Sequence, residues 1–246
     1  MENHELIRRL EDLAARCERS GTVTGSHFLT PAEQLQAERA FQNKARLLLH
    51  GGHPDCERRA CFFLPEWLEP EDFDPAEYLC AIRLTAHFGA PGHRDYLGSL
   101  LGMGVGREWI GDIWVDGESA IVFCLPSVEK HLLGIERAGR VSLTAEAAAL
   151  SSLPAPERKT EARSFTVASP RLDAVTAGMF KLSRSEAARR ISLGMVSINY
   201  ELSDKTDYEV SEGDVVSLRG AGKGKLVGFG GNSRKGRLFV YTEIYR

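Results

Sequence analysis

The uneven distribution of charge along the chain is the feature that most limits how it can fold. Residues 1–156 carry 15 Lys and Arg against 23 Asp and Glu, a balance of −8, whereas residues 157–246 carry 16 against 11, a balance of +5. The sign changes within a stretch rich in Ala, Ser and Pro, residues 145–159, which is typical of a linker. We therefore expect an acidic part and a basic part that fold separately, and the basic part suits a polyanion.

Composition excludes several classes of protein. The 246 residues, 43% of them hydrophobic, suffice for two or three small domains with cores of their own. The longest apolar stretches have only a handful of residues, whereas a bilayer span needs about 20, so no membrane span is predicted. The N-terminus lacks the apolar core of a signal peptide, and the five cysteines form no CxxC pair. We expect a reduced, cytoplasmic protein.

The first 52 residues predict a helical pair. Apolar residues recur at helical spacing over residues 5–20. Thr30-Pro31 opens a second helix, with Glu33 as its capping-box partner, and this helix is predicted to run through Leu47 and to stop at Gly51-Gly52. Residues 1–52 are therefore expected to form a helical region in front of the central domain.

Residues 53–150 alternate strand and helix patterns. Strands are predicted over Arg58 to Leu64, Tyr78 to His87, both sides of Asp116-Gly117, and Arg140 to Thr144, with helices over Arg94 to Gly102 and Pro126 to Gly134. From Tyr78 onward the order is β-α-β-β-α-β, that of the ferredoxin-like, or RRM-like, arrangement. The predicted class is α+β, with residues 53–150 as a central ferredoxin-like domain and residues 151–168 as a linker. Within that linker, residues 162–168 are an alternative strand on either side of the boundary.

Residues 169–246 predict two short helices followed by a small sheet. Ser169-Pro170 suits the start of the first helix, and the capping box from Ser183 to Glu186 starts the second after a break at Lys181-Leu182. Gly194 closes the second helix. Strands are predicted over Val196 to Ile198, Val215 to Leu218, Leu226 to Phe229 and Leu238 to Tyr245.

A series of positions in this last part resembles the S4 RNA-binding domain, which is named after a protein of the small ribosomal subunit. They are Arg171-Leu172-Asp173, Ser183-Arg184, Ala187, Gly194, Val196, Asn199, Gly213-Asp214 and Arg219. One departure is Tyr200, where many S4 domains have Gly. The resemblance implies a basic surface that binds folded RNA by its backbone and shape.

The candidate RNA-binding residues are mainly cations, whose contacts with phosphates supply affinity but little sequence choice. In the S4-like part they are Arg171, Lys181, Ser183, Arg184, Arg189, Arg190, Asn199, Lys223, Lys225, Arg234, Lys235 and Arg237, and in the earlier part Arg58, His93 and Arg94. For any single cation a solvated face is an equally good interpretation, because surface Lys and Arg are common. For His93 and Arg94 a structural role is the stronger alternative.

Four segments of the first half carry a second resemblance. They are residues 28–31 (FLTP), 51–59 (GGHPDCERR), 93–98 (HRDYLG) and 106–113 (GREWIGDI). Together with the S4-like part they are similar to the YlmH-type S4 proteins of bacteria over nearly the whole chain. The resemblance implies a helical N-terminus, a central ferredoxin-like domain that binds RNA, and an S4 domain. It further implies binding to rRNA of the large ribosomal subunit and to tRNA in ribosome-associated quality control, where the family holds a P-site tRNA during rescue of stalled nascent chains.

Sites for catalysis, metals and cofactors are not predicted. His93-Arg94-Asp95 spells a kinase catalytic triplet, but Leu100 stands where the kinase Asn belongs. His50, His53 and Cys56 are spaced like metal ligands, yet Gly51, Gly52 and Pro54 interrupt any helix there, so a loop without metal is expected. No complete GxGxxG or Walker A motif occurs.

Three hypotheses follow. The first is a non-enzymatic factor that binds the ribosome through rRNA and tRNA, with monomer as the default state. The second is an RNA-modifying enzyme, or a ribosome-assembly factor, that uses the S4 domain to reach rRNA. The third is an adaptor whose N-terminal helices bind a protein partner, although an amphipathic helix normally buries its apolar face within its own chain.

Overall fold

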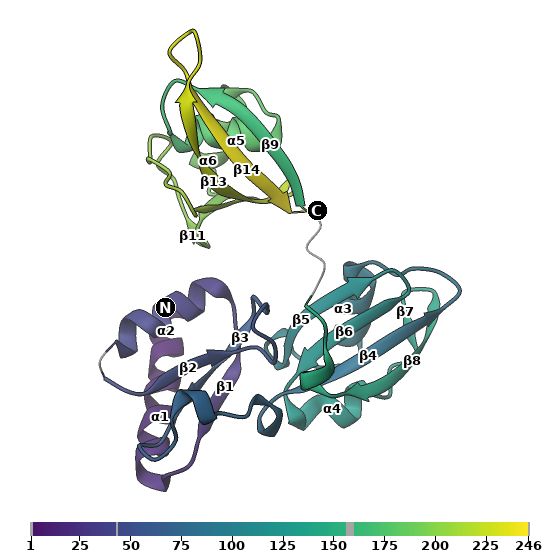
Figure 1. Ribbon diagram of the computed structural model, residues 1–246. Coiled ribbons are helices and arrows are strands. Elements are labelled where there is room, and N and C mark those ends of the chain that lie inside the picture. Colours follow the sequence, from purple (N-terminus) through teal and green to yellow (C-terminus); the bar gives the residue numbers. More distant parts are fainter. Residues whose placement is uncertain (1, 43, 156–159, 246) are drawn as a thin grey trace. The chain divides into compact units, whose positions relative to one another are not determined.

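The structure is a computed structural model that describes residues 2–42, 44–155 and 160–245 (Figure 1). The chain forms two compact units, residues 1–156 and 157–246. Their boundary lies where the charge balance changes sign. Among the helices of the described residues, none is long and apolar enough to span a bilayer.

The first unit begins with two helices on a three-stranded sheet. The elements are α1 (Glu2–Ser20), β1 (Thr24–Leu29), α2 (Pro31–Phe41), β2 (Leu47–His50) and β3 (Arg59–Phe63), and the antiparallel strand order is β1-β3-β2. Leu10, Cys17, Phe41 and Phe63 bury the helices against this sheet. The N-terminal region is therefore a mixed α/β layer, and the prediction of a purely helical pair was wrong.

The error arose at two places. Helix α2 begins as predicted, because Thr30 and Glu33 form the reciprocal capping box, but it ends at Phe41. Residues 47–50, predicted as its last turn, instead form β2, which pairs with β3. A short apolar run fits either element, and periodicity alone does not separate them. The predicted boundary at residue 53 also fails, since β3 belongs to the N-terminal sheet.

A five-stranded antiparallel sheet completes the first unit (Figure 1). Its elements are β4 (Cys80–His87), α3 (His93–Gly102), β5 (Ile110–Asp116), β6 (Ser119–Cys124), α4 (Pro126–Leu132), β7 (Arg137–Ala138) and β8 (Val141–Ala148), with the 3-10 turns η1 (Pro70–Asp72), η2 (Pro75–Glu77), η3 (Arg107–Trp109) and η4 (Leu150–Ser152) around them. The strand order is β5-β6-β4-β8-β7. Apart from the two-residue β7, the element order is the expected β-α-β-β-α-β.

Both faces of this sheet are covered, at least in part. One face buries Ile82, Leu84 and Val122 against Tyr96 and Leu100 of α3. On the other face Phe123 shares a core with Phe28 and Phe62 of the N-terminal sheet. The two sheets of the first unit are thus joined through a common apolar layer.

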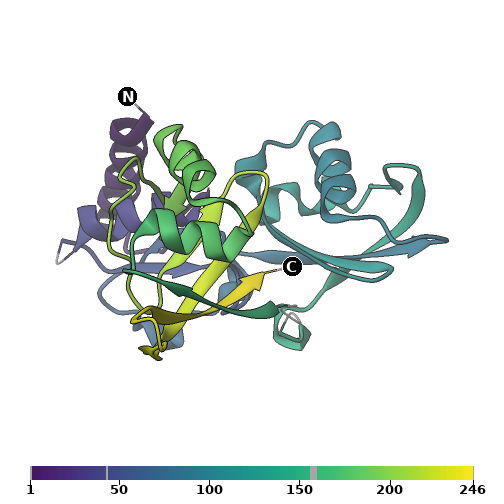
Figure 2. The same cartoon turned by 90° about the horizontal axis from the view of Figure 1, so that it is seen from above.

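The second unit is a six-stranded antiparallel sheet with two helices on one side. The elements are β9 (Thr160–Val167), α5 (Leu172–Phe180), α6 (Arg184–Ser192), β10 (Val196–Ile198), β11 (Glu201–Leu202), β12 (Val215–Leu218), β13 (Gly222–Asn232) and β14 (Leu238–Tyr245), and the strand order is β11-β10-β12-β13-β14-β9. Val175, Met179 and Ile191 of the helices pack on Leu226 and Val240 of the sheet. In the view from above both helices lie on the same side of the strands (Figure 2).

Two predicted boundaries in this part are corrected. The predicted linker, residues 151–168, contains β9, which pairs with β14 along its whole length. The helix predicted to start at Ser169-Pro170 begins at Leu172 instead. The N–H groups of Leu172 and Asp173 donate to the carbonyls of Tyr208 (2.8 Å) and Thr206 (3.0 Å), so a distant loop caps this helix in place of a serine.

We expect Gly178→Ala to destabilise the second unit by about 1–3 kcal/mol, because α5 packs directly on the ring of Phe165. A Cβ atom at residue 178 would lie inside the van der Waals contact distance of that ring. The matched control is Gly98→Ala in α3, where nothing lies within 4 Å of the added atom. Alanine is a better helix former than glycine, so the control variant should be neutral or more stable. Urea unfolding followed by circular dichroism measures both, and equal effects would contradict this packing.

Candidate nucleic-acid interface

The connection between α5 and α6 places several predicted RNA-binding residues in succession. Lys181 adopts a left-handed conformation (φ 54°, ψ 46°), and the following N–H, that of Leu182, donates to the carbonyl of Ala177 at 2.9 Å. Ser183 then caps α6, because its hydroxyl accepts from the N–H of Glu186 at 3.2 Å. The chain thus turns within three residues and leaves Lys181 and Ser183 exposed beside the first residue of α6, Arg184.

Asp173 orients the arginines at this connection. The residue is only 5% exposed. Its carboxylate accepts hydrogen bonds from Nε and Nη2 of Arg184 at 3.0 and 3.3 Å and from Nε of Arg171 at 3.4 Å. Burial raises the pKa of Asp173, but the hydrogen bonds from Arg184 and Arg171 outweigh it, and the net pKa is lowered. The carboxylate is therefore charged at neutral pH. Arg184 nevertheless leaves 55% of its side chain exposed. We call Arg171, Lys181, Ser183 and Arg184 the helix-break group.

The carboxylate of Glu186, predicted as the capping-box partner of Ser183, instead pairs with the cations of α6 and partly offsets their charge. Glu186 accepts from Nε of Arg189 at 2.9 Å and from Nε of Arg190 at 2.7 Å. These hydrogen bonds lower the pKa of Glu186 to about 2. The i+3 and i+4 spacing of the two arginines was the available signal for this pairing. Arg189 remains well exposed, whereas Arg190 is largely covered.

The side chain of Asn199 makes hydrogen bonds within the second unit. Its amide donates to Asp214 at 2.8 Å, and its carbonyl oxygen accepts from the N–H of Val215 at 2.9 Å. Asn199 and Tyr200 both have positive φ, 46° and 70°, and form the two-residue turn between β10 and β11. Both polar atoms of Asn199 are thus engaged within the protein, although the residue is exposed. Tyr200, where many S4 domains have Gly, adopts a positive φ at the second position of this turn.

The remaining predicted cations of the second unit lie on the sheet and its last hairpin. Lys223 and Lys225 belong to β13, where they alternate with the buried residues Gly224 and Leu226 that face the helices. Arg234, Lys235 and Arg237 are exposed at the connection of β13 to β14. Because α5 and α6 cover the opposite face, the structure separates Lys223 and Lys225 from the helix-break group.

In the first unit, the partly buried side chain of Arg58 connects two strands by hydrogen bonds to backbone carbonyls. Its Nη2 donates to the carbonyl of Phe28 at 3.0 Å and its Nε to that of Ile110 at 3.3 Å. Burial lowers the pKa of Arg58. Its backbone N–H and that of Glu57 donate to the carboxylate of Asp112 at 3.0 and 2.7 Å. The predicted RNA contact by Arg58 is corrected accordingly, since this side chain joins β1 to β5.

The residues missed at this junction are Arg107 and Asp112. Arg107 donates to the carbonyls of Ile110 and Gly111, and burial together with nearby Arg58 lowers its pKa to about 10. The sequence signal for these two residues was the block of residues 106–113, in which Arg107 and Asp112 stand on either side of Ile110, the first residue of β5.

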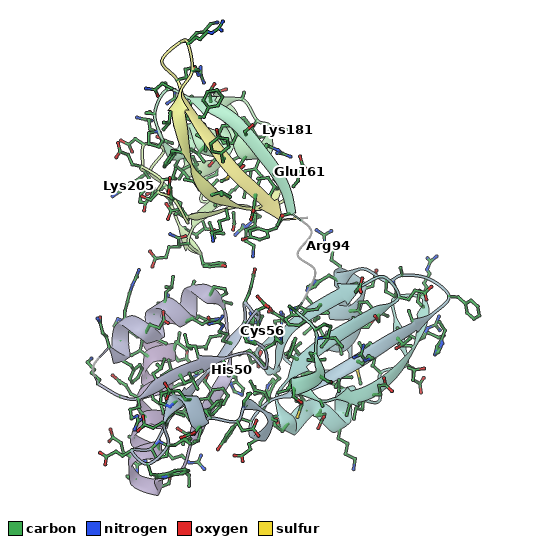
Figure 3. All side chains as sticks on the ribbon, in the orientation of Figure 1. His50, Cys56, Arg94, Glu161, Lys181 and Lys205 are labelled. Carbon is green, nitrogen blue, oxygen red and sulfur yellow. The ribbon has the colours of Figure 1, made fainter. Side chains whose placement is uncertain are left out.

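His93 and Arg94 form the first turn of α3. Asp95 accepts the N–H of Gly92 at 2.9 Å and so caps this helix. Burial lowers the pKa of His93, and the charge of Arg107 adds to the effect. Arg94 is exposed (Figure 3). Of the three predicted contacts in the first unit, Arg94 is the one placed best to meet a phosphate.

The histidines of the loop around His53 accept hydrogen bonds from the backbone of the loop itself. Nδ1 of His50 accepts the N–H of Gly52 at 3.0 Å, and Nδ1 of His53 accepts that of Asp55 at 3.2 Å. Burial strongly raises the pKa of the Cys56 thiol. Within the described ranges, no three or more His, Cys, Asp or Glu residues are grouped to hold a metal ion.

We expect Asp173→Asn to lower the free energy of unfolding by about 1–3 kcal/mol at neutral pH, since two arginines lose a buried charged partner. A carboxyl with a lowered folded pKa contributes stability above its unfolded pKa, and this contribution disappears as the pH falls through the folded value. The difference from wild type should therefore vanish in acid. Asp204→Asn, at an exposed acid of the same unit, is the control for urea unfolding. A pH-independent difference would argue against the pairing.

Comparison with known proteins places the chain in a family. Residues 69–152 match the family described as "Putative RNA-binding domain in YlmH". The chain is 32% identical over 219 residues, covering 88% of itself and 85% of the relative, to the ribosome-associated protein quality control protein P2 of Bacillus subtilis (strain 168). Its fold resembles the cell division protein ylmH from Streptococcus pneumoniae, with a TM-score of 0.53 and 17% identity over 61% of this chain and 93% of that one. The chain belongs to the YlmH family.

Proposed function

We propose that this protein is a non-enzymatic, monomeric factor of the cytoplasm that binds the large ribosomal subunit through rRNA and P-site tRNA during rescue of stalled nascent chains. The helix-break group carries the proposal, because Asp173 orients two arginines beside exposed Lys181. Arg171, Asp173 and Arg184 are among the positions at which the sequence resembles the S4 domain. The B. subtilis relative, by its name, is ribosome-associated, which supports the same role here.

The electrostatics favour RNA as the partner of the second unit. This unit has an excess of five positive charges, whereas the first has an excess of eight negative charges. A surface that neutralises phosphates releases counterions, so binding weakens steeply with salt. The pairing of Arg184 with Asp173 fixes the guanidinium without burying it, since 55% of its side chain stays exposed. A cation oriented in advance loses less conformational entropy when it contacts a phosphate.

Lys181→Gly tests this surface without disturbing the fold. Lys181 is exposed and left-handed, a conformation that glycine adopts freely at a helix C-terminus, so the free energy of unfolding should be unchanged or higher. Co-sedimentation with large subunits should weaken severalfold at moderate salt. The slope of log affinity against log salt should become shallower by about 0.7–0.9 for each phosphate that the variant no longer neutralises.

Lys205→Ala is the matched control, because it also removes one exposed lysine from the second unit. Lys205 and Lys181 lie at opposite ends of α5, because Lys205 precedes the loop that caps the first turn of this helix and Lys181 follows its last turn (Figure 3). Sedimentation of the Lys205 variant should match that of wild type. Equal losses in both variants would indicate a general charge effect and contradict the assignment to the helix-break group.

A further inference from the structure

The sheet of the second unit has a second face, on the side opposite α5 and α6. Along β14 the residues alternate, so that Val240, Thr242 and Ile244 are buried toward the helices. Phe239 and Tyr241 point the other way and are 36% and 46% exposed. Large exposed aromatic side chains that recur on one strand face are typical of a binding surface. We call this surface the open face; it comprises Phe239, Tyr241, Glu243 and Tyr245 of β14 with Lys223 and Lys225 of β13.

Lysines of the neighbouring strand lie beside these aromatic rings. Lys223 pairs in register with Tyr245, and Lys225 with Glu243. The ammonium of Lys223 is 5.0 Å from the ring centre of Tyr245 and 5.8 Å from that of Tyr200. These cation–π contacts orient the lysine across the sheet. The open face therefore combines π-surfaces with positive charge.

A glycine fixes how the ring of Tyr241 lies. A Cβ atom at Gly230 would come within 2.9 Å of the ring and hydroxyl of Tyr241 and within 3.1 Å of Cβ of Phe239. Only a residue without a side chain lets the Tyr241 ring rest against the backbone of β13 at this point. One side of the ring is thus supported by the protein while the residue remains 46% exposed. That is the arrangement of a platform on which a flat partner can stack.

We propose that the open face binds a single-stranded RNA segment, with bases stacked on Phe239 and Tyr241 and phosphates near Lys223 and Lys225. Stacking of bases on exposed aromatic side chains beside cations is how sheets bind unpaired nucleic acid without sequence choice. The inference takes RNA as the partner class from the proposed function, but it concerns a different surface from the helix-break group. The excess of five positive charges in this unit favours an anionic over an apolar partner, and the exposed aromatic rings favour RNA over an acidic protein, because RNA bases can stack on them.

Substitution of Glu243 distinguishes an RNA partner from a protein partner, because its carboxylate lies on the same face as the lysines. A phosphate backbone that runs along β13 and β14 would be repelled by this charge. Glu243→Gln should therefore strengthen RNA binding severalfold. A protein partner that used Glu243 as an ion-pair acceptor would be weakened by the same substitution.

The experiment uses the full chain and a fluorescein-labelled 12-nucleotide oligouridylate, which has no stable secondary structure, with binding followed by fluorescence anisotropy. Tyr241→Leu keeps apolar contact with Gly230 but removes the π-surface, and we expect affinity to fall on the order of tenfold. Tyr241→Phe keeps the ring and should bind within about twofold of wild type. A wild-type chain that does not bind the oligonucleotide, or a Tyr241→Leu variant that binds as well as wild type, overturns the proposal.

Lys181→Gly separates this proposal from the proposed function. It should weaken sedimentation with large subunits and leave oligouridylate affinity nearly unchanged. If oligouridylate binding depends on Tyr241 while ribosome binding is absent, the open face stands and the proposed function fails. If ribosome binding is intact while all open-face variants bind the oligonucleotide alike, the open face fails alone.

Discussion

The buried carboxylate of Asp173 determines how the second unit presents its charge. An isolated carboxylate at 5% exposure would be strongly unfavourable, so it requires the guanidinium groups of Arg171 and Arg184 at hydrogen-bond distance. This requirement ties the first turn of α6 to the first turn of α5. The connection between them, with Lys181 at its left-handed position, then has little freedom. A desolvation cost inside the unit thereby orders cations on its surface.

The first unit uses the same chemistry for a different purpose. Asp112 accepts two backbone N–H groups, and Arg58 and Arg107 donate to backbone carbonyls around β5. The hydrogen bonds of these charged side chains join the N-terminal sheet to the five-stranded sheet, next to the shared core at Phe123. The part that matches the RNA-binding family, residues 69–152, is therefore not a free-standing module in this chain but one side of a continuous apolar layer.

The sequence was informative at several places where the signal was local. The capping box at Thr30, the helix break at Lys181 and the β-α-β-β-α-β order all follow from neighbouring residues. The sequence failed where a distant partner decides. Residues 47–50 become a strand because β3 pairs with them. The side-chain amide of Asn199 donates a hydrogen bond to Asp214, fifteen positions away in the chain. A basic side chain also looks the same in a sequence whether it meets solvent, a carbonyl or a carboxylate.

The pairing of β9 with β14 brings the two ends of the second unit together. Thr160, the first residue of β9, lies opposite Tyr245 near the end of the chain. The first and last strands of the second unit are thus hydrogen-bonded neighbours, with β9 at the edge of the sheet and β14 beside it. The order of elements in this unit could be permuted by joining these two ends. A mechanical pull on the segment before Thr160 would load the β9–β14 ladder one residue pair at a time and would then reach α5, which follows β9 in the chain.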